Sequence, residues 1–340
     1  MEITVLQFIW FILLFVLLGG YAMLDGFDLG IGVWHLWARA EDRRSLLDAI
    51  RPVWDGNEVW LLTAGGAMFA AFPPVYASVF SGLYLALTLL LVGLIARASA
   101  VEFRDKEEAP SWRRFWDVCF AAGSIVPALL LGVAMGNILR GLPLDASGNF
   151  TGSFFSLLNP YALLCGLLGL AVIAAHGALY AVLRTPAPLA IRARRWARLA
   201  LQAALLLFGL AAAVTILTQR HLLTNYDRLP VLWAVPLATA LALSGAAAYN
   251  RRDKARPAFA ASCAGVLGLL ATAAVGLFPT LVPASNNAAL SLTAANSSSS
   301  ELTLRIMFIF ALVGMPIVIG YNVWAYRLWA TQQKGTSRDY

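Results

Sequence analysis

The residues best able to carry chemistry are five charged side chains that lie within or beside long apolar runs. Asp25 and Asp28 are three positions apart, as are Asp55 and Glu58, and Arg97 ends a stretch of 38 residues without a charge. The i, i+3 spacing places both members of each acidic pair on one face of a helix. Burial raises the pKa of a carboxyl group and a nearby guanidinium lowers it, so such a set can take up and release protons near neutral pH. The pattern therefore indicates proton transfer.

Composition shows that these groups lie in an apolar environment. Hydrophobic residues make up 60% of the 340 residues and charged residues 13%, and the mean hydropathy is +0.73. Soluble domains are about 45–50% apolar and about 25% charged, so a soluble enzyme, a disordered chain and a disulfide scaffold are excluded. Cys119, Cys165 and Cys263 lie in apolar runs without CxxC spacing. They predict neither a disulfide framework nor a cysteine metal site, and no metal site is expected.

Apolar runs of about 20 residues, the length that a bilayer requires, repeat along the whole chain. They predict an all-α integral membrane protein with about nine transmembrane helices. The expected spans are residues 4–34, 53–72, 77–96, 115–138, 160–182, 199–218, 230–249, 258–282 and 303–326. Pro73 and Pro74 predict the tight turn of a hairpin between the second and third spans.

The basic residues are distributed asymmetrically between the two sets of connections. Of the 25 Lys and Arg, only Arg140, Arg220, Arg228 and Arg305 fall outside alternate connections and the C-terminal tail. The positive-inside rule then predicts a multi-pass protein with an exterior N-terminus and a cytoplasmic C-terminus. The net charge of +7 is explained by topology and by membrane lipids with anionic headgroups, and nucleic acid is not an expected partner. The exterior segments 148–152 and 297–300 are expected to be solvated loops.

The acidic residues should lie at membrane depth on the cytoplasmic side. The apolar part of the second span, 59–72, would be about 21 Å long at 1.5 Å per residue, shorter than the ~30 Å hydrocarbon core. Residues 54–58 should therefore lie within or at the edge of the bilayer. A carboxylate facing lipid there would cost roughly 2.5–3.5 kcal/mol. We expect the acids to face a protein interior, a partner subunit or a file of water, with Arg97 as counter-charge.

A structural interpretation of the acids competes with this one. Asp55 would be favoured beside a helix N-terminus by the helix dipole alone. Glu58, Glu102 and Asp105 lie near the expected headgroup level, where charges are common. For Asp28 and Asp55 the functional interpretation is favoured because ionisable residues are rare at depth.

Histidine is scarce and scattered. His35 ends the first span, His176 lies in the fifth and His221 lies in an exterior loop. This distribution is a poor set of axial haem ligands. His176 is expected to be a packed, hydrogen-bonding residue.

Several glycines are placed for close helix packing. Gly26, Gly30 and Gly32 surround the first acidic pair, and Gly132 and Gly136 are four residues apart in the fourth span. Residues without a Cβ allow two helix backbones to approach closely in a membrane.

Two acidic segments together carry a specific resemblance. Residues 25–32 (DGFDLGIG) and 54–60 (WDGNEVW) are similar to the paired signatures of subunit II of the cytochrome bd-type quinol oxidases. The resemblance extends along nearly the whole chain. It includes the segments 80–84 (FSGLY), 102–106 (EFRDK), 159–161 (NPY) and 176–178 (HGA).

The resemblance implies a heterodimer in the bacterial cytoplasmic (inner) membrane. The larger partner, subunit I, carries haem b and haem d, oxidises quinol and reduces O2 to water with protons from the cytoplasm. Subunit II supports that partner and ligates no haem. In some members a quinone or a lipid also occupies subunit II, and a small single-span accessory subunit is left open.

The resemblance also implies an architecture and site residues. The single membrane domain, 1–340, would comprise a four-helix bundle in 1–140, a second in 158–283, a peripheral last helix in 302–329 and a cytoplasmic tail in 330–340. The matching positions imply proton delivery for Asp25, Asp28 and Asp55. They place Trp54 and Arg97 near the interface with the partner's haem.

Two other functions remain open. A stand-alone proton-coupled secondary transporter would also use buried acids, but it should carry polar or interrupted helices in both halves. Spans six to eight contain no Asp, Glu, Lys, Arg or His. A purely structural assembly subunit is the third alternative.

Overall fold

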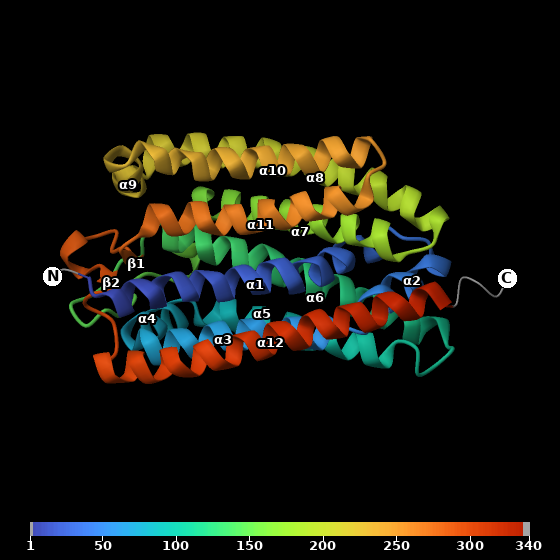
Figure 1. Cartoon of the computed structure of the whole chain (residues 1–340), viewed down its shortest axis with the longest axis horizontal. Helices are drawn as coiled ribbons and strands as arrows, with labels where there is room; N and C mark the ends of the chain where they lie inside the picture. The colour runs from blue at the N-terminus through green and yellow to red at the C-terminus, as the bar shows by residue number, and fades with distance from the viewer. Residues whose placement is uncertain (1–2, 336–340) are drawn as a thin grey trace.

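The computed structural model describes residues 3–335, with side chains through residue 325, and most of this part of the chain is helical (Figure 1). The long helices run side by side along one direction. They are α1 (Val5–His35), α3 (Trp54–Ala71), α5 (Tyr84–Phe103), α6 (Pro110–Arg140), α7 (Pro160–Arg184), α8 (Ala187–Thr218), α10 (Ala234–Arg251), α11 (Ala255–Leu277) and α12 (Glu301–Gly335). The shorter elements are α2 (Ala40–Ile50), α4 (Pro73–Gly82), α9 (Thr224–Arg228) and the antiparallel strands β1 (Thr280–Val282) and β2 (Leu292–Thr293).

Eight helices in the described part of the chain are long and apolar enough to cross a bilayer. They confirm the predicted all-α membrane protein. The second expected span, 53–72, forms α3, but its first turn is polar, and α3 is not among the eight helices with a long enough apolar stretch. The count of nine is therefore approximate, and α3 differs because it begins with the acidic segment.

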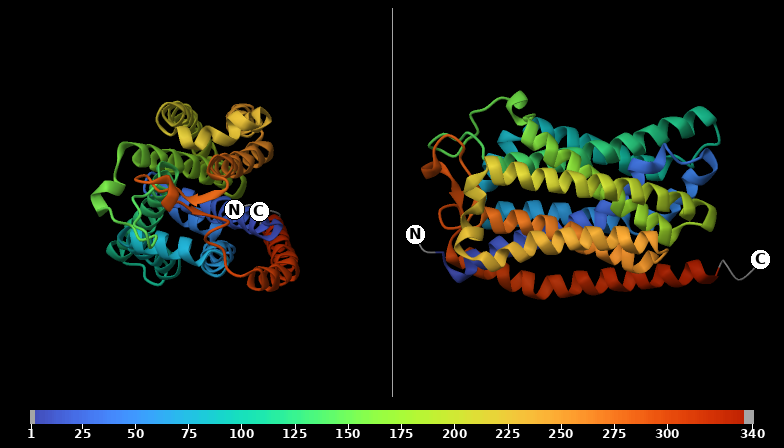
Figure 2. Two further views of the ribbon diagram at one scale, coloured as in Figure 1. Left: turned by 90° about the vertical axis from the view of Figure 1, so that its left-hand side faces the viewer. Right: turned by 90° about the horizontal axis from the view of Figure 1, so that it is seen from above.

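The helices of the second bundle and those of the first lie on opposite sides of the molecule, with α12 on the side of the first bundle. Both Figure 1 and the end-on view in Figure 2 place α8 and α10 on the side away from α3 and α12. Between them lie α1, α6 and α7, which pack against one another. α12 extends to Gly335, beyond the predicted end at residue 329. Residues 336–340 of the predicted tail lie outside the described residues.

The predicted hairpin turn is present but is built differently. α3 ends before Phe72, and Pro73 and Pro74 occupy the first two positions of α4, where a missing N–H is tolerated. A second break follows at Leu83, between α4 and α5. A Cβ at Gly82 would lie 2.7 Å from the Cβ of Phe150, so this break lies where a loop packs against the helix. The expected third span, 77–96, is thus two helices.

One connection that the sequence interpretation left as a loop contains an amphipathic helix. α2 buries Leu46, Leu47, Ala49 and Ile50, while Glu41, Arg44 and Asp48 are exposed. These apolar residues join a core cluster with the ends of α1 and α7. The end of the bundle opposite the β-strands is therefore covered by a helix.

The loops at the other end are more ordered than expected. Segment 148–152 is largely exposed, but the segment 297–300 packs on the bundle. Ser299 donates hydrogen bonds from its backbone N–H to the Ala71 carbonyl (2.9 Å) and from its Oγ to the Ala70 carbonyl (2.6 Å). These are end carbonyls of α3, which have no partner within the helix. The expectation of a simple solvated loop was therefore wrong for 297–300, because this segment caps α3.

Glycines allow backbone-to-backbone contact around α1, α6 and α7. A Cβ at Gly30 would overlap α7 and would lie 2.7 Å from the backbone nitrogen of Gly177. A Cβ at Gly136 would lie 2.7 Å from the Cα of Ala162. At Gly26 the nearest atom would be 3.8 Å away, an ordinary contact. The close-packing prediction is confirmed at Gly30 and Gly136 and does not hold at Gly26.

The contact at Gly30 predicts a large effect for a small change. Gly30→Ala should lower the free energy of unfolding by about 1–3 kcal/mol, because the added methyl group overpacks α1 against α7. The measurement is thermal unfolding of the purified protein in detergent. Gly209→Ala is the matched control, since a Cβ there meets nothing within 4 Å. An unchanged melting temperature for Gly30→Ala would contradict the prediction.

Candidate functional site

The predicted acids and Arg97 meet between three helices. α1 supplies Asp25 and Asp28, α3 supplies Asn57 and Glu58, and α5 supplies Arg97; we call these five residues the Arg97 cluster. Asp25, Asp28, Asn57 and Arg97 are buried, and the Glu58 side chain is 24% exposed. The i, i+3 spacing brings both aspartates to the same face of α1, as expected. The cluster therefore has a buried interior and one edge that reaches the surface.

Arg97 is the counter-charge of this cluster. One terminal guanidinium nitrogen lies 2.7 Å from Asp25 Oδ1, and the other lies 3.3 Å from Glu58 Oε2. Arg97 thus joins α5 to both α1 and α3. A planar guanidinium can hold two carboxylates in fixed directions, which an ammonium group cannot do. The predicted pairing of Arg97 with buried acids is confirmed.

Asp28 has no ion pair among the residues that the structure describes. Its Oδ2 accepts a hydrogen bond of 2.8 Å from the Asn57 side-chain amide, and that amide also donates to the Leu24 carbonyl at 3.3 Å. Asp28 Oδ1 and Asp25 Oδ2 are buried and have no hydrogen-bond partner in the described part of the chain. Buried polar atoms in proteins are nearly always paired with protein or water. Two carboxyl oxygens are therefore available to a proton or to water.

Asp55 and Trp54 begin α3 outside the buried interior. Asp55 is exposed, whereas Trp54 is partly buried against the core cluster that contains Ile50 and Val53. Asp55 and Glu58 line the same cavity, one helical turn apart on α3. The structure thus brings Asp25, Asp28 and Arg97 together and places Asp55 at the edge.

The cavity has a volume of about 850 Å³ and lies among α1, α3, α4, α5 and α6. Its walls are apolar over most of their area, with the aromatic residues Phe69, Tyr76, Phe80 and Tyr84 toward α4 and the two carboxyl groups of α3 at one end. Predominantly apolar walls with a few polar groups at one end are typical of a ligand site. The cavity can accept a long apolar molecule.

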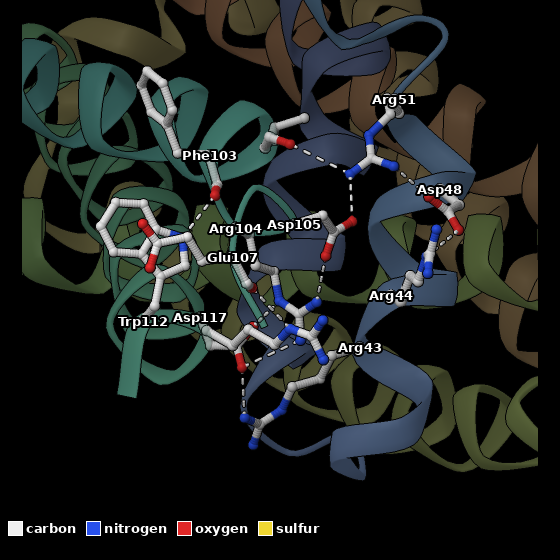
Figure 3. A network of polar contacts seen from close by, with 12 residues as sticks. Arg43, Arg44, Asp48, Arg51, Phe103, Arg104, Asp105, Glu107, Trp112 and Asp117 are labelled. Atoms are coloured by element: carbon white, nitrogen blue, oxygen red, sulfur yellow. Dashed lines mark hydrogen bonds and ion pairs between the residues drawn. The ribbon is translucent and has the colours of Figure 1, made fainter. Parts of the chain in front are cut away.

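A second polar network surrounds Asp117, which the sequence interpretation did not single out (Figure 3). Its Oδ1 lies 2.6 Å from His35 Nε2 and 2.5 Å from Arg104 Nε, and its Oδ2 lies 2.9 Å from Arg43. We call Asp117, His35, Arg104 and Arg43 the Asp117 cluster. It joins the ends of α1 and α5 to α2 and α6. A signal was present in the sequence, since Asp117 is the only charged residue of the expected span 115–138 and Arg104 follows Arg97 by two helical turns.

Asp105 extends this network to the surface. It lies after α5, and it accepts hydrogen bonds from Arg104 at 3.0 Å and from Arg51 at 2.9 Å. Partial burial alone would raise the pKa of Asp105, but these two guanidinium groups hold that pKa below its usual value. Asp105 is therefore ionised at neutral pH. It links the two arginines and does not exchange a proton in that pH range.

All three histidines have protein partners. His176 Nδ1 lies 2.7 Å from Ser262 Oγ, and its Nε2 lies 2.9 Å from the Met23 carbonyl. His221 contacts the Leu139 carbonyl, and His35 contacts Asp117. His176 is a packed, hydrogen-bonding residue between α1, α7 and α11, as expected. The ring nitrogens of His176 are both engaged, so this residue does not fit a haem ligand.

The chain thus forms an all-α membrane protein with a buried acid–arginine cluster, and comparisons with known proteins identify its family. The family model of cytochrome bd terminal oxidase subunit II matches residues 6–329. The chain is 39% identical to a probable cytochrome oxidase subunit 2 of Haemophilus influenzae, over 94% of this chain and 93% of that protein. It is 38% identical to cytochrome bd-I ubiquinol oxidase subunit 2 of Escherichia coli, over 96% and 94% of the two chains.

A relative and a solved structure extend the comparison. Cytochrome bd ubiquinol oxidase subunit 2 of Bacillus subtilis is 36% identical over 94% of each chain. The structure of bd oxidase from Geobacillus thermodenitrificans contains a chain with the same fold, with a TM-score of 0.79 and 17% identity over 96% of this chain and 99% of that one. The chain belongs to the family of subunit II of the cytochrome bd terminal oxidases. It is one subunit of a membrane-bound oxidoreductase complex.

Removing the Arg97 charge should strongly destabilise the protein, and removing a carboxylate charge as well should partly reverse the effect. Arg97→Gln should lower the free energy of unfolding by about 3–5 kcal/mol, because it leaves buried carboxyl groups without their counter-charge. Adding Asp25→Asn should restore part of that loss. Size-exclusion chromatography and thermal unfolding of the purified complex measure both effects.

Arg305→Gln is the control for this comparison. Arg305 pairs with Glu301 at 3.1 Å on an exposed face, where an ion pair contributes about 0–1 kcal/mol. If Arg97→Gln is no more destabilising than Arg305→Gln, the counter-charge assignment fails.

Proposed function

We propose that this chain supports a haem-bearing subunit I of a quinol oxidase and carries part of its cytoplasmic proton-uptake path. The observation that carries the proposal is the Arg97 cluster, in which one guanidinium holds Asp25 and Glu58, Asp28 lies beside them without an ion pair, and two carboxyl oxygens have no hydrogen-bond partner among the described residues. Water formation from O2 consumes protons, so an oxidase must bring them to a site within the membrane. A protein route through apolar surroundings needs buried groups of this kind.

The charge balance of the cluster explains how it would hold protons. Three ionised carboxylates against one guanidinium would leave a net charge of about −2 in a low-dielectric interior, which is strongly unfavourable. Protons on some of these carboxyl groups remove that cost. The buried pair Asp25 and Asp28 would then store protons, while Glu58 and the exposed Asp55 would connect them to the edge of α3.

The proposal assigns the redox chemistry to the partner subunit. Haem b and haem d supply one-electron transfer and O2 reduction when bound in subunit I. The chain itself offers no free histidine pair for a haem, since the ring of His176 is fully engaged and His35 contacts Asp117. Trp54 and Asp55, at the start of α3, would face the haem-bearing partner, and Arg97 would be linked to this end of α3 through Glu58.

The same reasoning supports an orientation and a domain division. The end of the bundle that carries α2 also carries most of the Lys and Arg, so we place it in the cytoplasm. The N-terminus is then exterior, and lipids with anionic headgroups contact the α2 end. The first bundle (1–140) would hold the Arg97 cluster, and the second (158–283) and last helix (302–329) would complete the membrane domain. A small single-span accessory subunit would pack against one of the lipid-facing helices of this domain.

Neutralising the buried acids tests the proton path. Asp28→Asn and Asp25→Asn, each in the assembled complex, should lower quinol-dependent O2 consumption per haem by at least about tenfold, because the amide cannot carry the proton. Asn keeps the size of the side chain and one hydrogen-bonding oxygen. Glu301→Gln, on an exposed face of α12, is the control and should retain full turnover.

The alternatives predict other outcomes of this experiment. Near wild-type turnover with normal haem content in both variants would reject the proton path. A lower yield of complex with unchanged turnover per haem would favour a purely structural subunit. Purification without a haem-rich partner would favour a stand-alone transporter.

The 850 Å³ cavity supports a second proposal, that this chain binds an isoprenoid quinone or a lipid chain. Gly66 lines the cavity and a Cβ there would meet nothing within 4 Å. The larger side chain of Gly66→Phe should therefore fill part of the cavity. The amount of quinone or lipid extracted per purified complex should fall by about tenfold, which corresponds to a loss of about 1.4 kcal/mol of binding free energy. Gly209→Phe, on α8 away from the cavity, is the control. Equal extraction from both variants would reject the site.

A further inference from the structure

The proposed proton path does not use the Asp117 cluster, yet this cluster shares two helices with the Arg97 cluster. α1 contributes Asp25 and Asp28 to one and His35 to the other, and α5 contributes Arg97 and, at its C-cap, Arg104. Arg97 and Arg104 are two helical turns, or about 10.5 Å, apart on the same face of α5. The two clusters are therefore two layers that connect the same pair of helices.

α6 determines where Arg97 lies. A Cβ at Gly123 would lie 2.8 Å from the backbone nitrogen of Arg97 and 3.1 Å from its Cβ. One turn earlier on α5, a Cβ at Gly93 would lie 2.9 Å from Pro127 Cγ. The backbone that carries the guanidinium thus rests directly on α6. Any movement of α6 along its axis would be transmitted to Arg97.

The same stretch of α6 also rests on α1. Ser124 occupies the space beside Gly32, where a Cβ would overlap it, and its Oγ donates to the Phe120 carbonyl at 2.7 Å. The Phe120 ring is fully buried and lies edge-on to His35, with 4.9 Å between ring centroids. α6 is therefore wedged between the helix that carries Arg97 and the helix that carries Asp25.

Asp117 lies on α6 about one turn before Phe120 and holds this part of α6 against α1 and α5. Its carboxylate is buried and accepts from His35 on α1 and from Arg104 at the end of α5. Arg43 of α2 occupies its other oxygen at 2.9 Å. Charge-assisted hydrogen bonds of this length are directional and strong. The carboxylate thus ties α6 to both neighbouring helices at one level.

We propose that Asp117 is a positioning residue that sets the axial register of α5 against α1 and thereby holds the Arg97 guanidinium on Asp25 and Glu58. The functional part of this inference rests on the proposed proton path. Arg97 must reach Asp25 at 2.7 Å and Glu58 at 3.3 Å at the same time. A slip of one residue along a helix moves a side chain by about 1.5 Å, enough to break one of these two contacts.

The direct test is a cryo-EM structure of the whole complex with Asp117→Asn, compared with the unmodified complex. Asparagine keeps the size of the side chain but removes its charge. We expect α5 to shift relative to α1 and Arg97 to leave hydrogen-bonding distance of Asp25 Oδ1. An Arg97–Asp25 contact that is the same in both complexes would overturn the proposal.

Turnover provides a second readout that a merely structural role would not produce. Asp117→Asn should lower quinol-dependent O2 consumption per haem by about tenfold, as expected for a displaced functional group. In an Asp25→Asn background the same change should cost less than about twofold, because the contact it positions is already absent. Equal losses in both backgrounds would count against positioning.

Asp42→Asn is the matched control. Asp42 pairs with Arg192, so this change also breaks an ion pair between two helices at the α2 end, but the partner lies on α8 and not on α5 or α6. It should leave turnover per haem and the Arg97 contact unchanged. If Asp117→Asn does not assemble, the pair Arg104→Gln and Asp117→Asn removes both charges together. Failure of that pair while Asp42→Asn assembles would overturn the proposal and make the cluster a folding requirement.

The outcomes separate this inference from the proposed function. If Arg97 moves in Asp117→Asn while turnover is unchanged, positioning stands and the proton path fails. If Arg97 stays in place while Asp25→Asn and Asp28→Asn lose turnover, the proton path stands and positioning fails.

Discussion

The rest of the site depends on one interaction, the guanidinium of Arg97 buried among the carboxyl groups of α1 and α3. In an apolar interior a lone charge is very costly, so each group constrains where the others lie. Arg97 reaches Asp25 and Glu58 together, and this requires three helices to keep fixed relative positions. The glycine contacts of α6 and α7 and the ion pairs at the α2 end meet that requirement in the described structure.

The helices of the chain pack together by two different kinds of contact, and this difference follows from the same constraint. α1, α3, α5 and α6 carry the buried charges and meet through close backbone contacts and ion pairs. α8, α10 and α11 join the molecule through apolar side chains and small residues, as in the cluster around Ala197, Ala246 and Ala258. Among the described residues of α8, α10 and α11 no charged side chain is buried, so these helices can scaffold α7 and α1 without placing charge in the interior. This arrangement suits a subunit whose chemistry is concentrated on one side.

Sequence reasoning predicted the helical membrane fold and the pairing of Arg97 with the acids, because hydropathy and the cost of buried charge are local and strong signals. It did not predict the break at Leu83 or the capping of α3 by Ser299, since both depend on loops that are distant in sequence. It also missed Asp117, whose three partners come from three other helices. Spacing can place two residues on one helix face, but it does not show which faces meet.

The depth of Asp28 has an electrical consequence. Asp28 precedes His35, the last residue of α1, by two helical turns, about 10.5 Å of rise. This is roughly one third of a ~30 Å hydrocarbon core. A proton that enters from the α2 end and rests on Asp28 has therefore crossed about a third of the membrane potential, or roughly 0.8 kcal/mol per 100 mV. Proton occupancy of this helix would thus depend on voltage as well as on pH, and the position of one aspartate along α1 sets the size of that dependence.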